Sequence, residues 1–171
     1  MLGPRPLTVL VVLIVGGLLA LSGCGGDDAP QTKEGFILEA DGVCETFVDE
    51  FAEAGAQNPG TPKEVADANK VLADLYERFS ERISEVRLPA AGAARTQAQA
   101  YVDSVRRSEP VLDRLRAASD EFLQAARGDD AQAFRAAGNN LRQALDAFRA
   151  SRAVSDRLAV EYGLTLCGNL D

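Results

Sequence analysis

The chain contains no histidine and no tryptophan, and it has three cysteines and one methionine in 171 residues. The absence of histidine removes the commonest general base and the usual nucleophile–histidine triad. It also excludes the Glu-x-x-His motif of di-iron helical bundles. We therefore predict no catalytic residues, no cofactor and no metal site.

A long apolar run is also missing. Residues 7–21 carry no charge, but a helix that spans a bilayer needs about 20 apolar residues. Arg5 precedes this run and small residues follow it, which is typical of a secretory signal. We expect residues 1–23 to be an export signal and not a transmembrane helix.

The end of this signal carries a motif. Leu21-Ser22-Gly23-Cys24 resembles the lipobox of bacterial lipoproteins. The resemblance implies a diacylglyceryl thioether on Cys24, cleavage between Gly23 and Cys24, and anchoring at the extracytoplasmic face of the cell membrane. Two acyl chains suffice for stable anchoring, since each buried methylene contributes about 0.8 kcal/mol. The alternative is a plain signal peptide cleaved elsewhere, with Cys24 free or in a disulfide.

If Cys24 is acylated, two cysteines remain, Cys44 and Cys167. Disulfides persist outside the cytoplasm, so we expect these two residues to pair. Two unpaired buried thiols are the alternative. A metal site made of two cysteines alone is less favoured, because structural zinc sites use four ligands.

The part of the chain after Gly23 is acidic. It holds all 26 acidic residues and 17 of the 18 basic ones, a net side-chain charge of −9. This balance argues against nucleic acid or an anionic lipid surface as the main partner. Its 148 residues fit one domain with a single core.

The domain is expected to be all-α. Residues 24–33 form a short polar segment with the lipidated cysteine and a flexible tether, and residues 34–171 form the folded domain. Apolar residues at helical spacing predict helices at about 34–56, 62–88, 91–127 and 130–162. Short connections between four amphipathic helices favour an up-down-up-down four-helix bundle.

Helix boundaries are marked by local signals. Thr61-Pro62-Lys63-Glu64 is typical of a capping box with proline at the first helical position. Asp129 or Asp130 is expected to cap the last helix. Gly163 followed by Leu164 fits a Schellman-type ending.

Two residues disturb the predicted helices. Pro110 should kink or split the third helix, with Ser108 available as a new cap. Gly42 inside the first helix costs about 1 kcal/mol relative to alanine. We therefore expect either that packing requires a small residue at Gly42 or that the helix begins late.

An up-down-up-down topology places the start of the first helix and the end of the last at the same end of the bundle. The expected Cys44–Cys167 disulfide is compatible with that arrangement and would close a loop of more than 100 residues. A loop of this size contributes at most about 4 to 5 kcal/mol by chain entropy. Because the anchor precedes the first helix, this end should be the membrane-proximal one.

Charge is distributed unevenly between the first and last helices. Arg135, Arg142 and Arg149 recur every seven residues in the last helix. We interpret them as a solvated flank that partly neutralises the first helix, with a docking strip for an anionic partner as the alternative. The first helix has no base between residues 34 and 56 but seven acids, Glu34, Glu39, Asp41, Glu45, Asp49, Glu50 and Glu53.

We interpret these seven acids as soluble surface. A calcium site and a surface for a basic partner are the alternatives. The acidic residues lack the Asp-x-Asp-x-Asp-Gly spacing of an EF-hand loop.

The segments 40–44 (Ala-Asp-Gly-Val-Cys) and 162–167 (Tyr-Gly-Leu-Thr-Leu-Cys), with the alanine- and arginine-rich composition, resemble small helical lipoproteins of actinobacterial envelopes. Many of these have no assigned activity. The resemblance implies a location in the envelope and no particular chemistry.

Three functions remain to be weighed. The favoured one is a non-catalytic interaction or scaffold module that docks an envelope protein partner. The second is a binding protein for a lipid or other apolar ligand. An enzyme is least favoured, because the apolar stripes contain no Asp or Glu for a carboxylate site. Six phenylalanines could line a ligand cavity or simply form the core: Phe47, Phe51, Phe79, Phe122, Phe134 and Phe148.

Overall fold

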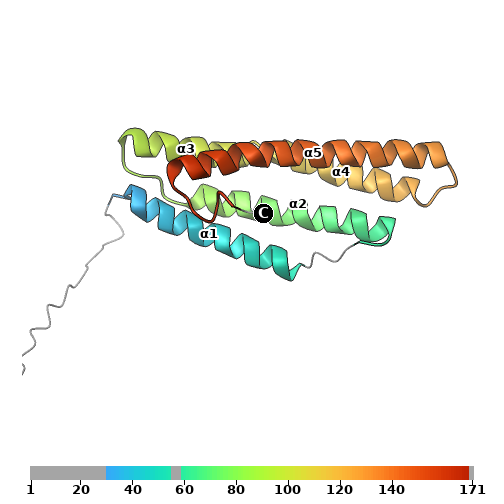
Figure 1. Ribbon diagram of the computed structural model, residues 1–171, viewed down its shortest axis with the longest axis horizontal. Coiled ribbons are helices and arrows are strands. Elements are labelled where there is room, and N and C mark those ends of the chain that lie inside the picture. The colour runs from blue at the N-terminus through green and yellow to red at the C-terminus, as the bar shows by residue number, and fades with distance from the viewer. Residues whose placement is uncertain (1–29, 55–58, 170–171) are drawn as a thin grey trace, which may run out of the picture.

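A computed structural model describes residues 30–54 and 59–169 of the chain (Figure 1). The predicted signal peptide, the cleavage site after Gly23 and the lipidation site Cys24 lie outside the described residues. The described ranges contain no strand. Their helices are α1 (Lys33–Glu53), α2 (Pro62–Glu85), α3 (Gly92–Arg106), α4 (Glu109–Ala125) and α5 (Ala131–Tyr162).

The helices pack as four antiparallel rods. α3 and α4 follow one another along the third rod, and α5 runs back beside both of them (Figure 1). The predicted up-down-up-down four-helix bundle is confirmed. The start of α1 and the end of α5 lie at the same end, where the rings of Phe36 and Tyr162 are 5.4 Å apart.

Two predicted caps are present. The Thr61 hydroxyl accepts from the Glu64 N–H, and the Glu64 carboxylate accepts from the Thr61 N–H at 3.0 Å. Asp130 Oδ1 accepts from the N–H groups of Gln132 and Ala133, at 2.8 and 3.1 Å. Both caps satisfy N–H groups that the first turn of a helix leaves free, so α2 and α5 begin where the sequence predicts.

The first helix differs from its prediction at both ends. The Thr32 hydroxyl accepts from the Gly35 N–H at 3.0 Å, and Lys33 is already helical. The Gln31 carbonyl accepts from the Ala90 N–H at 3.0 Å, which ties this entry to the loop between α2 and α3. Residues 31–33, which the sequence assigns to the tether, therefore belong to the folded domain. At the other end, α1 stops at Glu53 and not at residue 56.

Pro110 splits the third rod, as one of the two predicted outcomes. α3 ends at Arg106 and α4 begins at Glu109, with Ser108 at the N-cap. The expected capping role of the Ser108 side chain is wrong. Its hydroxyl is buried and shares a hydrogen bond with the Ser151 hydroxyl of α5 at 2.7 Å. The break between α3 and α4 is therefore bonded to the neighbouring helix α5.

Neither expectation for Gly42 holds. α1 passes through Gly42 without interruption. Gly42 is exposed, and no atom lies within 4 Å of the place where a Cβ would stand. Packing therefore requires no small residue here, and the helix does not begin late.

The core contains the aromatic and aliphatic seams of all four rods. Phe47, Phe79 and Phe148 are buried, and Phe122 is half-buried. Phe51 and Phe134 are 44% and 37% exposed, because Phe51 is near the end of α1 and Phe134 is in the first turn of α5. Of the two alternatives given for the six phenylalanines, a place in the core therefore does not hold for Phe51 and Phe134.

Candidate functional site

One end of the bundle is closed by a covalent link. Cys44 of α1 and Cys167, which follows α5, form a disulfide across 123 residues of sequence, with their Cα atoms 5.2 Å apart. Both residues are buried. The predicted pairing is confirmed, and neither free thiols nor a metal site at these two cysteines applies.

The chain turns back at Gly163 to reach Cys44. Gly163 has a φ of 101°, a left-handed conformation that side chains disfavour. Its N–H bonds to the Val160 carbonyl at 3.1 Å, and the Leu164 N–H bonds to the Ala159 carbonyl at 2.9 Å. This is the predicted Schellman ending, and it sends residues 164–167 toward α1.

Asp41 holds this returning tail. Its Oδ2 accepts from the Thr165 N–H and hydroxyl at 3.0 and 2.8 Å. Its Oδ1 accepts from the N–H groups of Leu166 and Cys167 at 3.0 and 3.3 Å. From the sequence we interpreted Asp41 as surface charge. The sequence signal for its role in the tail is that Asp41 precedes Cys44 by three residues, so both lie on one face of a helix. We call Asp41, Cys44 and residues 164–167 the clasp.

Buried tyrosines lie beside the clasp. The Tyr101 hydroxyl is 3.8 Å from the Cys44 sulfur, and burial raises the pKa of Tyr101 well above its ordinary value. Burial also raises the pKa of Tyr162, and the negative charge of the nearby Glu34 carboxylate raises it further. This end of the bundle is therefore apolar inside, and it keeps both phenols protonated.

Farther along α1, the bundle has a pocket between α1, α2 and α5. We call it the α1–α5 groove. Its volume is about 140 Å³, and it is lined by Phe47, Phe51, Leu72, Leu145, Phe148, Arg149 and Arg152.

The floor of the α1–α5 groove is a cluster of packed rings. The ring centre of Phe47 lies 5.1 Å from that of Phe79 and 5.9 Å from that of Tyr76. The ring centres of Tyr76 and Phe148 are 5.0 Å apart. Phe51, 6.2 Å from Phe47, extends the cluster to the surface. Interlocked rings have few alternative rotamers, so the floor is a preformed apolar surface.

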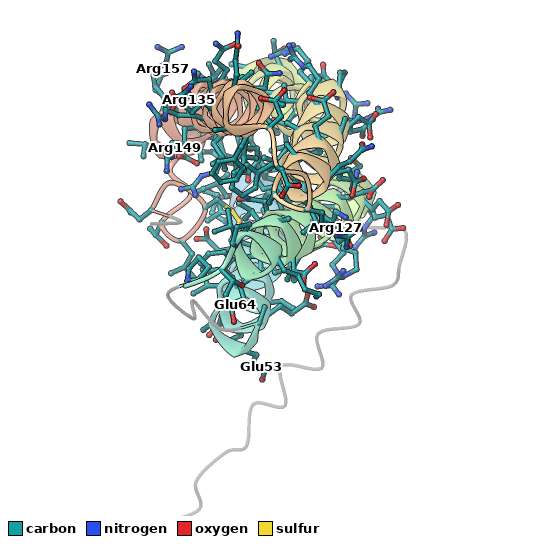
Figure 2. All side chains as sticks on the ribbon, turned by 90° about the vertical axis from the view of Figure 1, so that its right-hand side faces the viewer. Glu53, Glu64, Arg127, Arg135, Arg149 and Arg157 are labelled. Atoms are coloured by element: carbon teal, nitrogen blue, oxygen red, sulfur yellow. A yellow bond between two sulfur atoms is a disulfide. The ribbon has the colours of Figure 1, made fainter. Side chains whose placement is uncertain are left out.

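The rim of the groove on α5 is basic. Arg149 is exposed and pairs with Asp146 of its own helix at 3.2 Å. Arg152 pairs with Asp156 at 3.5 Å, and both side chains are largely covered, at 21% and 24% exposure. Arg135 and Arg142 continue the exposed side of the same helix. Figure 2 shows Arg135 and Arg149 on α5, well away from Glu53 at the end of α1.

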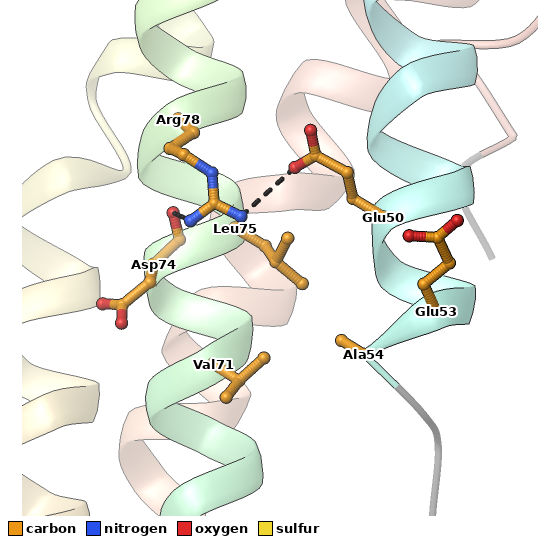
Figure 3. A pocket seen from close by; sticks show the side chains of 7 residues that line it. All are labelled: Glu50, Glu53, Ala54, Val71, Asp74, Leu75 and Arg78. Atoms are coloured by element: carbon orange, nitrogen blue, oxygen red, sulfur yellow. Dashed lines mark hydrogen bonds and ion pairs between the residues drawn. The ribbon is translucent and has the colours of Figure 1, made fainter.

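A second hollow lies between α1 and α2 (Figure 3). It has a volume of about 380 Å³, and four of its seven lining residues are charged. Glu50 in its wall accepts from Arg82 at 2.7 Å and from Arg78 at 3.2 Å. These bonds hold the pKa of Glu50 below its ordinary value. The hollow is therefore crossed by ion pairs that join α1 to α2.

These pairs correct the charge interpretation of the sequence. We expected the arginine flank of the last helix to neutralise the acidic first helix. In the structure the cationic partners of Glu50 come from α2, as Arg78 and Arg82, and Arg149 pairs within α5. The arginine stripe is thus displayed along an outer edge of the bundle.

The described residues contain no group of three or more His, Cys, Asp or Glu side chains placed to hold a metal ion. Within the same ranges, no helix is both long and apolar enough to span a bilayer. Apart from the three tyrosines, the buried polar residues in these ranges are five serines: Ser80, Ser104, Ser108, Ser119 and Ser155.

The fold and these features define a four-helix bundle that is clasped by a disulfide at one end and carries an apolar groove with a basic rim. Comparison of the chain with protein-family models, with curated proteins and with solved structures found no significant match.

Proposed function

We propose that this chain is a membrane-anchored extracytoplasmic lipoprotein that acts as a non-catalytic interaction module of the cell envelope. Its contact surface is the α1–α5 groove. The observation that carries the proposal is the preformed ring floor of this groove beside exposed arginines. Packed aromatics in a small pocket, surrounded by polar rim residues, are the usual centre of a protein–protein interface.

The groove favours a protein partner over an apolar small molecule. Its volume is about 140 Å³, whereas pockets for small molecules usually measure about 300 to 1,000 Å³. The groove has room for one inserted side chain and too little for an acyl chain. No catalytic residue, cofactor or metal is needed for this role.

Two features support an extracytoplasmic location. The Cys44–Cys167 disulfide is stable where the surroundings are oxidising. Leu21-Ser22-Gly23-Cys24 supplies a lipidation motif, and acylation at Cys24 would place the clasped end, which is also where α1 begins, next to the membrane.

The anchor is tested with the full-length chain in bacterial cells fed an alkyne fatty acid. The wild-type protein should carry the label and sediment with membranes, and Cys24→Ala should lose both properties. Ser22→Ala keeps a small residue in the motif and serves as the matched control. Membrane retention of Cys24→Ala without label would show that lipidation is not the anchor.

The choice between a partner and an apolar ligand is tested by native mass spectrometry of the mature protein purified from membranes. An interaction module should show the acylated chain with no further retained small molecule. A bound mass that disappears on unfolding, and that Phe51→Ala reduces, would favour the ligand-binding function.

A further inference from the structure

The two edges of the α1–α5 groove carry opposite charge. Glu45 and Asp49 are exposed on α1, and Arg149 is exposed on α5, where it lines the groove with Phe51. Within the described residues, neither Glu45 nor Asp49 has an ion-pair partner, whereas Glu50 on the same helix has two. The chain therefore displays an acidic edge and a basic edge on either side of one apolar pocket.

The acidic edge also displays apolar side chains. Val48 and Phe51 are each 44% exposed, although Phe47 beside them is only 4% exposed. Large apolar groups left beside a pocket and flanked by charge are typical of a contact surface.

We propose that the occupant of the α1–α5 groove is a second copy of this chain. A two-fold axis that runs parallel to the bundle and just outside the groove sets α1 of each chain against α5 of the other. Because this axis keeps every residue at its own height, Asp49 of one chain, with Glu45 one turn away, then faces Arg149 of the other, twice over. Val48 and Phe51 cover the rim of the facing groove. This inference rests on the proposed function of the groove as a contact surface.

The charges of the two edges favour an axis parallel to the helices over an axis perpendicular to them. An axis perpendicular to the helices sets α1 against α1 and α5 against α5, which brings acids against acids and arginines against arginines. Such like-charge contacts cost several kcal/mol at an interface. The parallel dimer also leaves both N-termini at one end, as two anchors in one membrane require. Confinement to that membrane raises the effective concentration of the two chains.

The test uses the full-length protein in intact cells, with the photo-reactive residue p-benzoylphenylalanine in place of Val48. Light should produce an adduct of twice the chain mass, and mass spectrometry should join position 48 to a peptide of α5. Val71, which is 41% exposed on α2 and borders the α1–α2 hollow and not the groove, is the matched control. The same replacement at Val71 should give no dimer adduct.

The other products separate this inference from the proposed function. A dimer joined through α1 and α1 would overturn the parallel arrangement. An adduct with a different protein would overturn the second copy as occupant while leaving the groove a docking surface. Only monomeric products would overturn both the second copy and the groove as a contact surface.

Charge reversal provides an independent check. Arg149→Glu and Glu45→Arg/Asp49→Arg each make both edges of a chain alike in sign, so each should lower the yield of dimer adduct by about tenfold or more. Co-expression of the two variants should restore the adduct as a mixed dimer, because opposite edges then face each other. All three positions are exposed, so the reversals leave the core intact. A mixed pair that stays monomeric would contradict the proposed contacts.

Discussion

The two halves of α1 are held in different ways. The first half is covered on one side by the tail after α5, which is joined to it through Cys167 and the hydrogen bonds of Asp41. The second half is joined on one side to α2 by the Glu50 ion pairs, and on its other side it borders the α1–α5 groove. The clasp thus fixes one half of α1, while the other half keeps the apolar side chains of the α1–α5 groove accessible.

The contacts in the two halves also differ in kind. Asp41 of the clasp accepts three backbone N–H groups and one hydroxyl in fixed geometry. Long, partly solvated side chains make the ion pairs beside the groove, and such pairs contribute about 0 to 1 kcal/mol each. Stability should therefore be concentrated in the clasp, and changes there should exceed any at the groove.

The largest effect is expected from removing the disulfide. Cys44→Ala/Cys167→Ala should lower the free energy of unfolding by about 4 kcal/mol, since the link closes a loop of more than 100 residues. Urea denaturation followed by circular dichroism measures the change. The reduced wild-type protein should show a similar loss. A difference below about 1 kcal/mol would mean that the clasp is held mainly by Asp41.

High pH should act on both halves of the molecule at once. The protein has three tyrosines: Tyr76 under the groove, and Tyr101 and Tyr162 near the clasp. Burial raises the pKa of each above the ordinary value of 10.0. The unfolded chain therefore loses protons above pH 10 that the folded chain keeps, and stability falls by up to about 1.4 kcal/mol per pH unit for each buried phenol.

Phenolate absorbance at 295 nm measures this directly. It should stay low above pH 10 while the protein is folded and then rise together with the loss of helical circular dichroism. Titration in urea gives the unfolded reference. Phenolate that forms near pH 10 with the helix signal intact would identify a tyrosine that is accessible in the folded protein.

A smaller loss is expected from Asp41→Asn. The amide keeps one acceptor oxygen but presents an NH₂ group to donors, so some of the four bonds to the tail break. Hydrogen bonds to a charged group contribute about 1.5 to 3 kcal/mol, and we expect a loss of about 2 kcal/mol in urea denaturation. Hydrogen exchange should increase in residues 164–167 and not around the groove.

The matched control for Asp41 is Glu53→Gln, which removes a charge from an exposed position on the same helix. Its effect should be within about 0.5 kcal/mol. Equal effects of the two variants would show that net charge, and not the clasp, is responsible.

The clasp and the groove also differ in how far the sequence predicts them. The Thr61 cap and the Gly163 turn are local, because they depend on residues within one helical turn. The cysteine pairing follows from having two candidates once Cys24 is assigned to the anchor. The role of Asp41 depends on partners 124 residues or more away, which no periodicity indicates.

The groove was less predictable for a similar reason. Apolar spacing tells which side of a helix faces the core, but it does not tell whether the neighbouring helix covers that side. Phe51 therefore matches the predicted stripe although it is 44% exposed. Likewise, the choice of the Ser108 hydroxyl between capping its own helix and bonding to Ser151 is decided by tertiary packing.

The smallest effect is expected at Gly42, which lies on α1 between Asp41 and Val48. Gly42→Ala should raise the free energy of unfolding by about 0.5 to 1 kcal/mol, because alanine is the better helix former and nothing lies within 4 Å of its Cβ position. Gly163→Ala is the opposite control, since its φ of 101° strains any side chain and should lower stability. A destabilising effect of Gly42→Ala would instead mean that the methyl group meets a neighbour, contrary to the open surroundings of Gly42 in the structure.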